Sequence, residues 1–112
     1  MDAQRAGELL ARERARIEQE IAALEREGPL EASDRKVPGD EESEDLYQDE
    51  MNLGRAEDLR QQLDSVARAE ARLAAGTYGL SIETGKPIPD ERLEVIPTAE
   101  RTVEEEERRA SG

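Results

Sequence analysis

The sequence has no cysteine and no histidine, and this double absence excludes several kinds of chemistry. Disulfide bonds and thiolate nucleophiles need cysteine, imidazole catalysis needs histidine, and structural zinc sites are built mainly from these two residues. Only carboxylates remain as candidate metal ligands. We expect a chain that binds no cofactor and no metal.

Aromatic and apolar residues are also scarce. The chain has two tyrosines and no phenylalanine or tryptophan, and 35% of its residues are hydrophobic against 40% charged. General acid–base catalysis needs carboxylates in an apolar pocket, for which this chain has little material, so we expect no enzyme. Low hydrophobicity with a net charge of -13 is typical of disorder, but it also fits an elongated helical structure with a narrow apolar seam.

Long hydrophobic runs are missing as well. Residues 1–10 contain no basic segment followed by an apolar core, and no stretch is apolar enough to cross a bilayer. We expect a cytoplasmic protein with no membrane association. Its acidic balance opposes binding to a phosphate backbone, so we expect no direct contact with nucleic acid and a basic protein surface as partner.

Apolar residues recur at helical spacing in two long segments. The first helix is expected over about residues 2–27, with a stripe of Leu10, Ile17, Ile21 and Leu24, and it ends at Gly28-Pro29. The second is expected over about residues 43–75, with Leu53, Ala56, Leu59, Leu63, Val66 and Leu73 on one side. Each stripe is too narrow for a globular core, so the sequence predicts a mainly α fold in which residues 1–75 form an antiparallel coiled-coil hairpin.

The connector between these helices carries much of the negative charge. Residues 31–50 hold nine acidic and two basic side chains, which gives this segment a local net charge of -7. The connector becomes the tip of the hairpin, around residues 30–45. An acidic loop between helices is most often a solvated connector, and the sequence pattern by itself leaves that alternative open.

After residue 75 the helical period stops and glycine and proline recur. Leu80-Ser81-Ile82 alternates like a short strand, and Thr84-Gly85-Lys86-Pro87 is typical of the turn after it. Residues 76–112 are therefore expected to form a compact second part, which we call the knob, and residues 103–109 a last short helix.

One ordered set of short motifs runs through this part: Tyr78-Gly79, Gly85, Ile88-Pro89, Arg92-Leu93 and Pro97-Thr98-Ala99. The set resembles the zinc-finger region of the DksA/TraR family, over about residues 76–106. The resemblance places the family's four zinc-binding cysteines at Ser81, Thr84, Thr102 and Glu105. Hydroxyls are poor zinc ligands, so we expect a degenerate finger without zinc. Apolar packing is expected to replace the metal through Tyr78, Leu80, Ile82, Ile88, Leu93, Val95, Ile96 and Val103.

The resemblance also implies a function. In this family the hairpin is understood to enter the secondary channel of RNA polymerase, which implies transcription regulation with Asp40, Glu41, Glu42 and Asp45 as the partner-binding residues. The family's Asp-x-x-Asp-x-Ala tip motif matches poorly, since Glu41 stands for its second Asp and Ser43 for its Ala. The alternative is an interaction or scaffold protein whose helices dimerise or dock elsewhere. We expect a monomer or a weak dimer.

Overall fold

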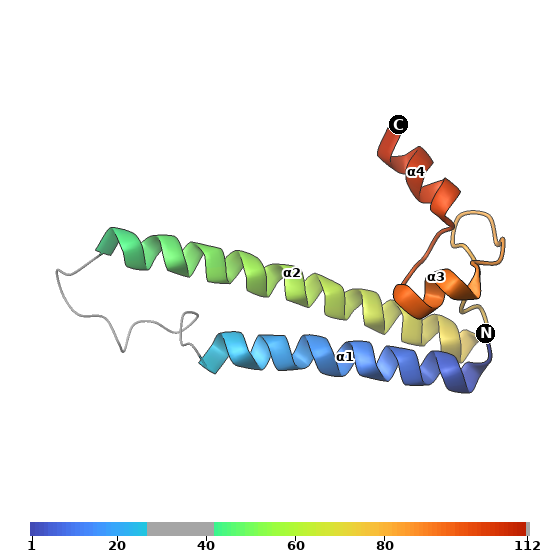
Figure 1. The fold of residues 1–112 in the computed structure, drawn as a ribbon, viewed down its shortest axis with the longest axis horizontal. Helices are drawn as coiled ribbons and strands as arrows, with labels where there is room; N and C mark the ends of the chain where they lie inside the picture. The colour runs from blue at the N-terminus through green and yellow to red at the C-terminus, as the bar shows by residue number, and fades with distance from the viewer. Residues whose placement is uncertain (27–41, 112) are drawn as a thin grey trace. The chain divides into compact units, whose positions relative to one another are not determined.

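The computed structural model describes residues 1–26 and 42–111, with side chains at 1–26 and 53–111. In these described residues four helices follow one another, α1 (Ala3–Arg26), α2 (Glu42–Ala75), α3 (Asp90–Val95) and α4 (Val103–Ser111), as Figure 1 shows. Within these residues the short strand expected at 80–82 is reduced to one isolated bridge between Leu80 and Pro87. The mainly α fold is confirmed. No helix in the described ranges is long and apolar enough to cross a membrane.

The ends of the two long helices follow from local hydrogen bonding. Asp2 caps α1, because its carboxylate accepts a hydrogen bond from the Arg5 N–H at 2.7 Å. At the end of α2, the N–H of Gly76 donates to the Leu73 carbonyl and that of Thr77 to the Arg72 carbonyl. This pair of hydrogen bonds requires a residue in the left-handed backbone conformation, and Gly76 adopts it with a φ of 83°. The glycine therefore fixes where the knob begins.

Contacts divide the chain into two compact units, and the first consists of Met1–Arg14 with Asp64–Gly112. In this unit α1 and α2 run antiparallel, since Gly7 approaches Leu73 while Arg14 pairs with Glu70. The apolar seam between these helix parts is fully or almost fully buried and consists of Ala6, Leu9, Leu10, Val66 and Ala69. The predicted stripes therefore pack within the chain.

The second unit is Ala15–Leu63. Ile17 and Leu24 of α1 and Ala56 and Leu59 of α2 are its buried apolar residues among those described, whereas Leu53 is exposed. Arg16 donates to both Glu20 and the Gln62 side-chain oxygen beside this seam. The division expected between residues 75 and 76 stays a prediction.

The knob has a small apolar core of its own. Ile88, Leu93 and Ala99 are buried together, and Tyr78 packs against them. The Tyr78 hydroxyl donates to the Pro97 carbonyl at 2.8 Å, so the ring is fixed at both ends. Ion pairs connect this part to the long helices of the same unit. Arg5 of α1 pairs with Glu94, and Glu100 pairs with both Arg68 and Arg72 of α2.

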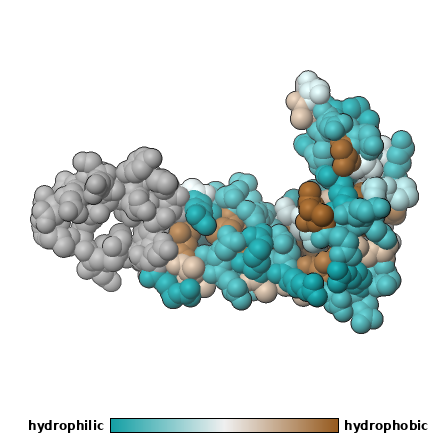
Figure 2. Space-filling model, in the orientation of Figure 1, coloured by the Kyte–Doolittle hydropathy of each residue, from teal (hydrophilic) through white to brown (hydrophobic). Residues whose placement is uncertain are grey.

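The predicted apolar packing of the knob is largely wrong. Ile88 and Leu93 are buried, but five of the other residues proposed for it are exposed, namely Leu80, Ile82, Val95, Ile96 and Val103. Figure 2 shows the result on one face, where the surface is mostly hydrophilic with separate hydrophobic spots. A segment this short and rich in turns cannot place every apolar side chain inside. Something other than apolar burial must therefore help to hold the knob.

Gly79 gives a first prediction because its φ is 85° and an added Cβ would lie 3.5 Å from Leu93 Cδ1. Gly79→Ala should lower the free energy of unfolding by about 1–2 kcal/mol, the cost of a left-handed conformation for an L-residue. Gly54→Ala is the matched control, because Gly54 lies inside α2 with nothing within 4 Å of an added Cβ. Gly54→Ala should raise the free energy of unfolding by about 0.5–1 kcal/mol. Urea unfolding measures this free energy for both variants, and changes of the same sign in the two variants would contradict the prediction.

Candidate functional site

The most developed polar arrangement in the described residues begins at a tight turn in the knob. The Ser81 N–H donates to the Lys86 carbonyl at 2.8 Å, and the Gly85 N–H donates back to the Ser81 carbonyl at 2.9 Å. Gly85 has a φ of 77°, which lets the chain close. Inside the turn the Ser81 hydroxyl oxygen accepts the N–H groups of Glu83 and Thr84, at 3.0 and 3.3 Å. The Thr84 hydroxyl oxygen accepts the N–H of Lys86 at 3.3 Å.

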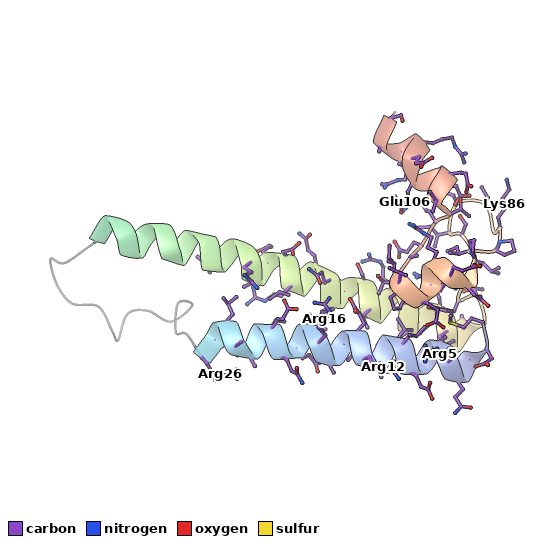
Figure 3. The ribbon with its side chains drawn as sticks, viewed as in Figure 1. Arg5, Arg12, Arg16, Arg26, Lys86 and Glu106 are labelled. Carbon is purple, nitrogen blue, oxygen red and sulfur yellow. The ribbon has the colours of Figure 1, made fainter. Side chains whose placement is uncertain are left out.

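The second part of the arrangement is the start of α4. The Thr102 side chain accepts the Glu105 N–H at 3.2 Å, and the Glu105 carboxylate accepts the Thr102 N–H at 2.9 Å. This reciprocal pair is a capping box, in which Thr-x-x-Glu satisfies two backbone donors at a helix start. It fixes the Glu105 side chain at the base of α4. Figure 3 shows the turn that carries Lys86 beside the part of α4 that carries Glu106.

The two parts meet at the Glu105 carboxylate. The Ser81 hydroxyl donates to Glu105 Oε1 and the Thr84 hydroxyl to Oε2, each at 2.6 Å. Glu105 is 2% exposed, and Ser81 and Thr102 are buried as well. Hydrogen bonds from Ser81, Thr84 and the Thr102 backbone stabilise the ionised form and lower the pKa of Glu105 to about 2. A buried carboxylate is thus satisfied entirely by neutral donors.

The structure brings together all four positions that the resemblance matches to zinc-binding cysteines, because Ser81, Thr84 and Thr102 all hydrogen-bond to Glu105. Sequence reasoning missed that Glu105 is the centre on which the others converge. A signal was present, because Thr102-Val103-Glu104-Glu105 is a capping-box sequence. The acidic run 104–107 concealed it, since such a run is typical of a solvated helix face.

These four residues do not suit the zinc ion that the resemblance implies. Zinc prefers thiolate and imidazole ligands, which offer electron pairs to the metal. Here the Ser81 and Thr84 hydroxyls direct their hydrogens at the Glu105 carboxylate, which lies between them. In the described part of the chain no group of three or more His, Cys, Asp or Glu residues could hold a metal ion. The donor set is that of a hydrogen-bonded cluster.

The predicted partner-binding residues are not part of this cluster. Asp40 and Glu41 lie outside the described residues, and Glu42 and Asp45 lie in the first turns of α2, where side chains are not described. Their role stays a prediction. In the knob, the Arg92 guanidinium donates to the Arg101 backbone carbonyl at 3.2 Å.

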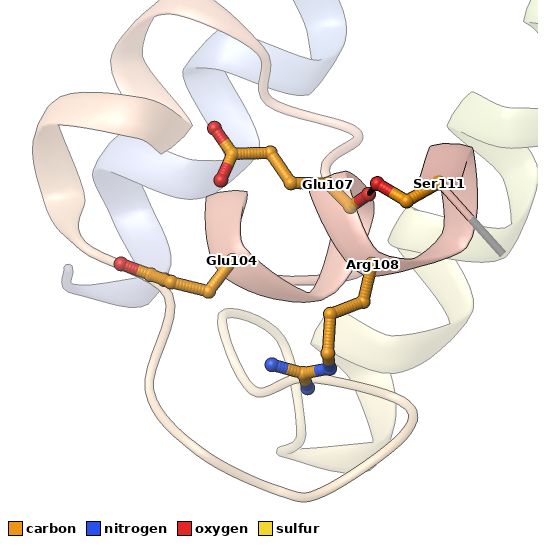
Figure 4. Close-up of a pocket in the computed structure, with 4 residues that line it drawn as sticks. All are labelled: Glu104, Glu107, Arg108 and Ser111. Atoms are coloured by element: carbon orange, nitrogen blue, oxygen red, sulfur yellow. Dashed lines mark hydrogen bonds between the residues drawn. The ribbon is translucent and has the colours of Figure 1, made fainter.

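A surface pocket lies on α4 and is shown in Figure 4. Its lining consists of Glu104, Glu107, Arg108 and Ser111, all from this one helix. Ser111 donates its hydroxyl proton to the Glu107 backbone carbonyl at 2.9 Å. Because no second element contributes to the lining, the pocket offers no converging set of groups for a substrate.

The Glu105 cluster should make the knob sensitive to acid. The pKa of the Glu105 carboxyl is lowered on folding from 4.5 to about 2, so the ionised carboxylate stabilises the knob fully above pH 4.5. That stabilisation should be lost as the pH falls from 4.5 through about 2. Hydrogen exchange at residues 76–106 between about pH 6 and pH 2 measures the loss. Glu105→Gln should remove this part of the pH dependence and the exposed control Glu107→Gln should not; equal slopes in all three proteins would contradict the assignment.

The structure of the chain is similar to that of transcription factor DksA2 from Pseudomonas aeruginosa, with a TM-score of 0.86 and 30% identity, covering 97% of this chain and 83% of that one. Sequence matches are general stress protein 16O of Bacillus subtilis strain 168, 49% identical over 45 residues, and the uncharacterized protein YteA of the same strain, 39% identical over 72 residues. The matches cover 28% and 29% of those two proteins, so the chain spans less than a third of either. No family model matches the chain.

Proposed function

The chain belongs to the DksA/TraR family of transcription factors, as a member without cysteine, and from this membership we propose that it regulates transcription by binding RNA polymerase. The observation that carries the proposal is the likeness to DksA2, which extends over 97% of the chain and includes both long helices and the knob. We assign the protein a regulatory role in the cytoplasm and no catalytic one.

The proposed mode of binding is insertion of the hairpin into the secondary channel of the polymerase, with Asp40, Glu41, Glu42 and Asp45 at the tip. The distribution of charge supports it. Residues 15–63 hold 15 acidic and six basic side chains, whereas the remaining residues hold 14 and ten. An excess of acid in one part of the chain steers that part toward a basic surface and raises the rate of association.

Burial of the apolar stripes supports a protein that acts as a monomer. Leu10, Ile17, Leu24, Leu59 and Val66 are buried within the chain, so these side chains are not available to a second copy. The helices can then present a polar outer surface to a channel. Size-exclusion chromatography with light scattering measures the oligomeric state, which stays a prediction.

Binding to purified core RNA polymerase tests the proposal, together with transcription in vitro. We expect retention in a pull-down at low salt and weaker retention as salt screens the charges. Replacing Asp40, Glu41, Glu42 and Asp45 together by alanine should reduce the effect on transcription by on the order of tenfold, while affinity changes by less than about threefold, because exposed charges contribute little to affinity.

A control variant separates the position of the acids from their number. Glu25, Glu57, Glu104 and Glu107 are exposed acidic residues outside the tip, and their joint replacement by alanine changes the net charge by the same amount. This variant should keep its effect on transcription. No binding of the native chain at low salt would overturn the proposal, and equal behaviour of the two variants would reduce the tip to a connector.

A further inference from the structure

The hydrogen-bonded cluster of the knob has the spacing of a metal site. Ser81 and Thr84 are three residues apart in a tight turn, and Thr102 and Glu105 are three residues apart at the start of α4. Structural zinc sites commonly take their ligands as two such pairs, each with two residues between its members. In this chain the two pairs come from segments about 20 residues apart and meet at one point.

The surroundings of the turn also match those of a metal site. Three backbone N–H groups, from Glu83, Thr84 and Lys86, donate to the side-chain oxygens of Ser81 and Thr84. Around a bound metal, such outer hydrogen bonds orient the ligand atoms and stabilise their negative charge. A neutral hydroxyl needs less of this support than a thiolate does. The turn therefore retains donors at the places where charged ligand atoms would need them.

The centre of the cluster has the opposite charge to a metal ion, and this explains the residue types around it. A cation needs groups that offer electron pairs, whereas a carboxylate needs groups that offer hydrogens. Serine and threonine hydroxyls do the second, as Ser81 and Thr84 do here at 2.6 Å from the two carboxylate oxygens. Alanine at positions 81 and 84 would leave the buried carboxylate without these two donors, which is costly.

We propose that Ser81, Thr84, Thr102 and Glu105 form a metal-binding frame in which the Glu105 carboxylate has taken the place of the ion, so that four thiols at these positions would bind zinc. The inference concerns the frame alone and does not depend on polymerase binding. It goes beyond the loss of the cysteines, because it states that the backbone has kept the geometry of the site and that one side chain has reversed its polarity.

The test is a full-length variant with Ser81→Cys, Thr84→Cys, Thr102→Cys and Glu105→Cys together. After loading with zinc and gel filtration in the presence of a weak chelator, it should retain about one zinc per chain. Cobalt in place of zinc should give the absorption bands of a tetrahedral thiolate site. Where the metal-free variant is unfolded in the knob, the addition of zinc should restore protection from hydrogen exchange at residues 76–106.

The matched control moves all four substitutions by two residues. Glu83→Cys, Lys86→Cys, Glu104→Cys and Glu107→Cys have the same number and spacing of thiols, but these four residues are exposed. This variant should retain no stoichiometric zinc against the chelator, and neither should the native chain. Equal retention by the two cysteine variants, no retention by the first, or one zinc on the native chain would each overturn the proposal.

Discussion

Glu105→Ala is expected to open the knob while α1 and α2 stay folded. The change removes the acceptor for the Ser81 and Thr84 hydroxyls and for the Thr102 N–H. Buried donors left without a partner are destabilising, and we expect the melting temperature of the knob to fall by on the order of 10 °C. Hydrogen exchange followed by mass spectrometry localises the effect, with loss of protection at residues 81–86 and 102–106.

The control for this variant lies two residues further along the same helix. Glu107 is exposed, and Glu107→Ala removes the same chemical group from α4 without touching the cluster. It should leave both the melting temperature and the exchange pattern nearly unchanged. Similar exchange patterns in the two variants would mean that Glu105 acts only through the net charge of the helix.

Leu93→Ala is expected to have the largest effect among apolar substitutions in the knob. Leu93 is 1% exposed and packs with Ile88 and Ala99, so truncation leaves a cavity that the short surrounding segments can fill only in part. Such substitutions cost about 2–5 kcal/mol. Urea unfolding followed by hydrogen exchange of the knob measures this loss.

Val95 provides the comparison for Leu93, because it lies on the same helix α3 and is 78% exposed. Val95→Ala should change the free energy of unfolding by no more than about 0.5 kcal/mol. A large loss of free energy of unfolding in Val95→Ala would instead support the apolar packing of Val95 that was predicted from the sequence and that the structure contradicts.

The long helices were predictable because their signal repeats. Leu10, Ile17 and Leu24 return to one face of α1, and each is buried as this spacing requires. The end of α2 was predictable as well, since the helical spacing of apolar residues stops before Gly76. This glycine adopts the left-handed conformation that ends the helix. Local rules suffice where a segment is long and regular.

The knob was less predictable because its contacts join residues far apart in sequence. The spacing of apolar residues carries no information about burial in a short turn, so the exposure of Ile82 and Ile96 could not be predicted from the sequence. The positions of the cluster came from the resemblance, but the role of Glu105 depends on which of four successive acids faces inward. The pairing of Arg72 with Glu100, 28 residues apart, has no local pattern either.

The hydrogen bond of Tyr78 to the Pro97 carbonyl gives the protein an optical reporter of its own knob. The chain has no tryptophan, so its near-ultraviolet absorption and fluorescence come from two phenol rings, and one of them lies against Ile88, Leu93 and Ala99. Burial raises the pKa of the Tyr78 hydroxyl, which separates its ionisation from that of a solvated tyrosine in an alkaline titration. The state of the knob can therefore be followed by spectroscopy in the unlabelled protein.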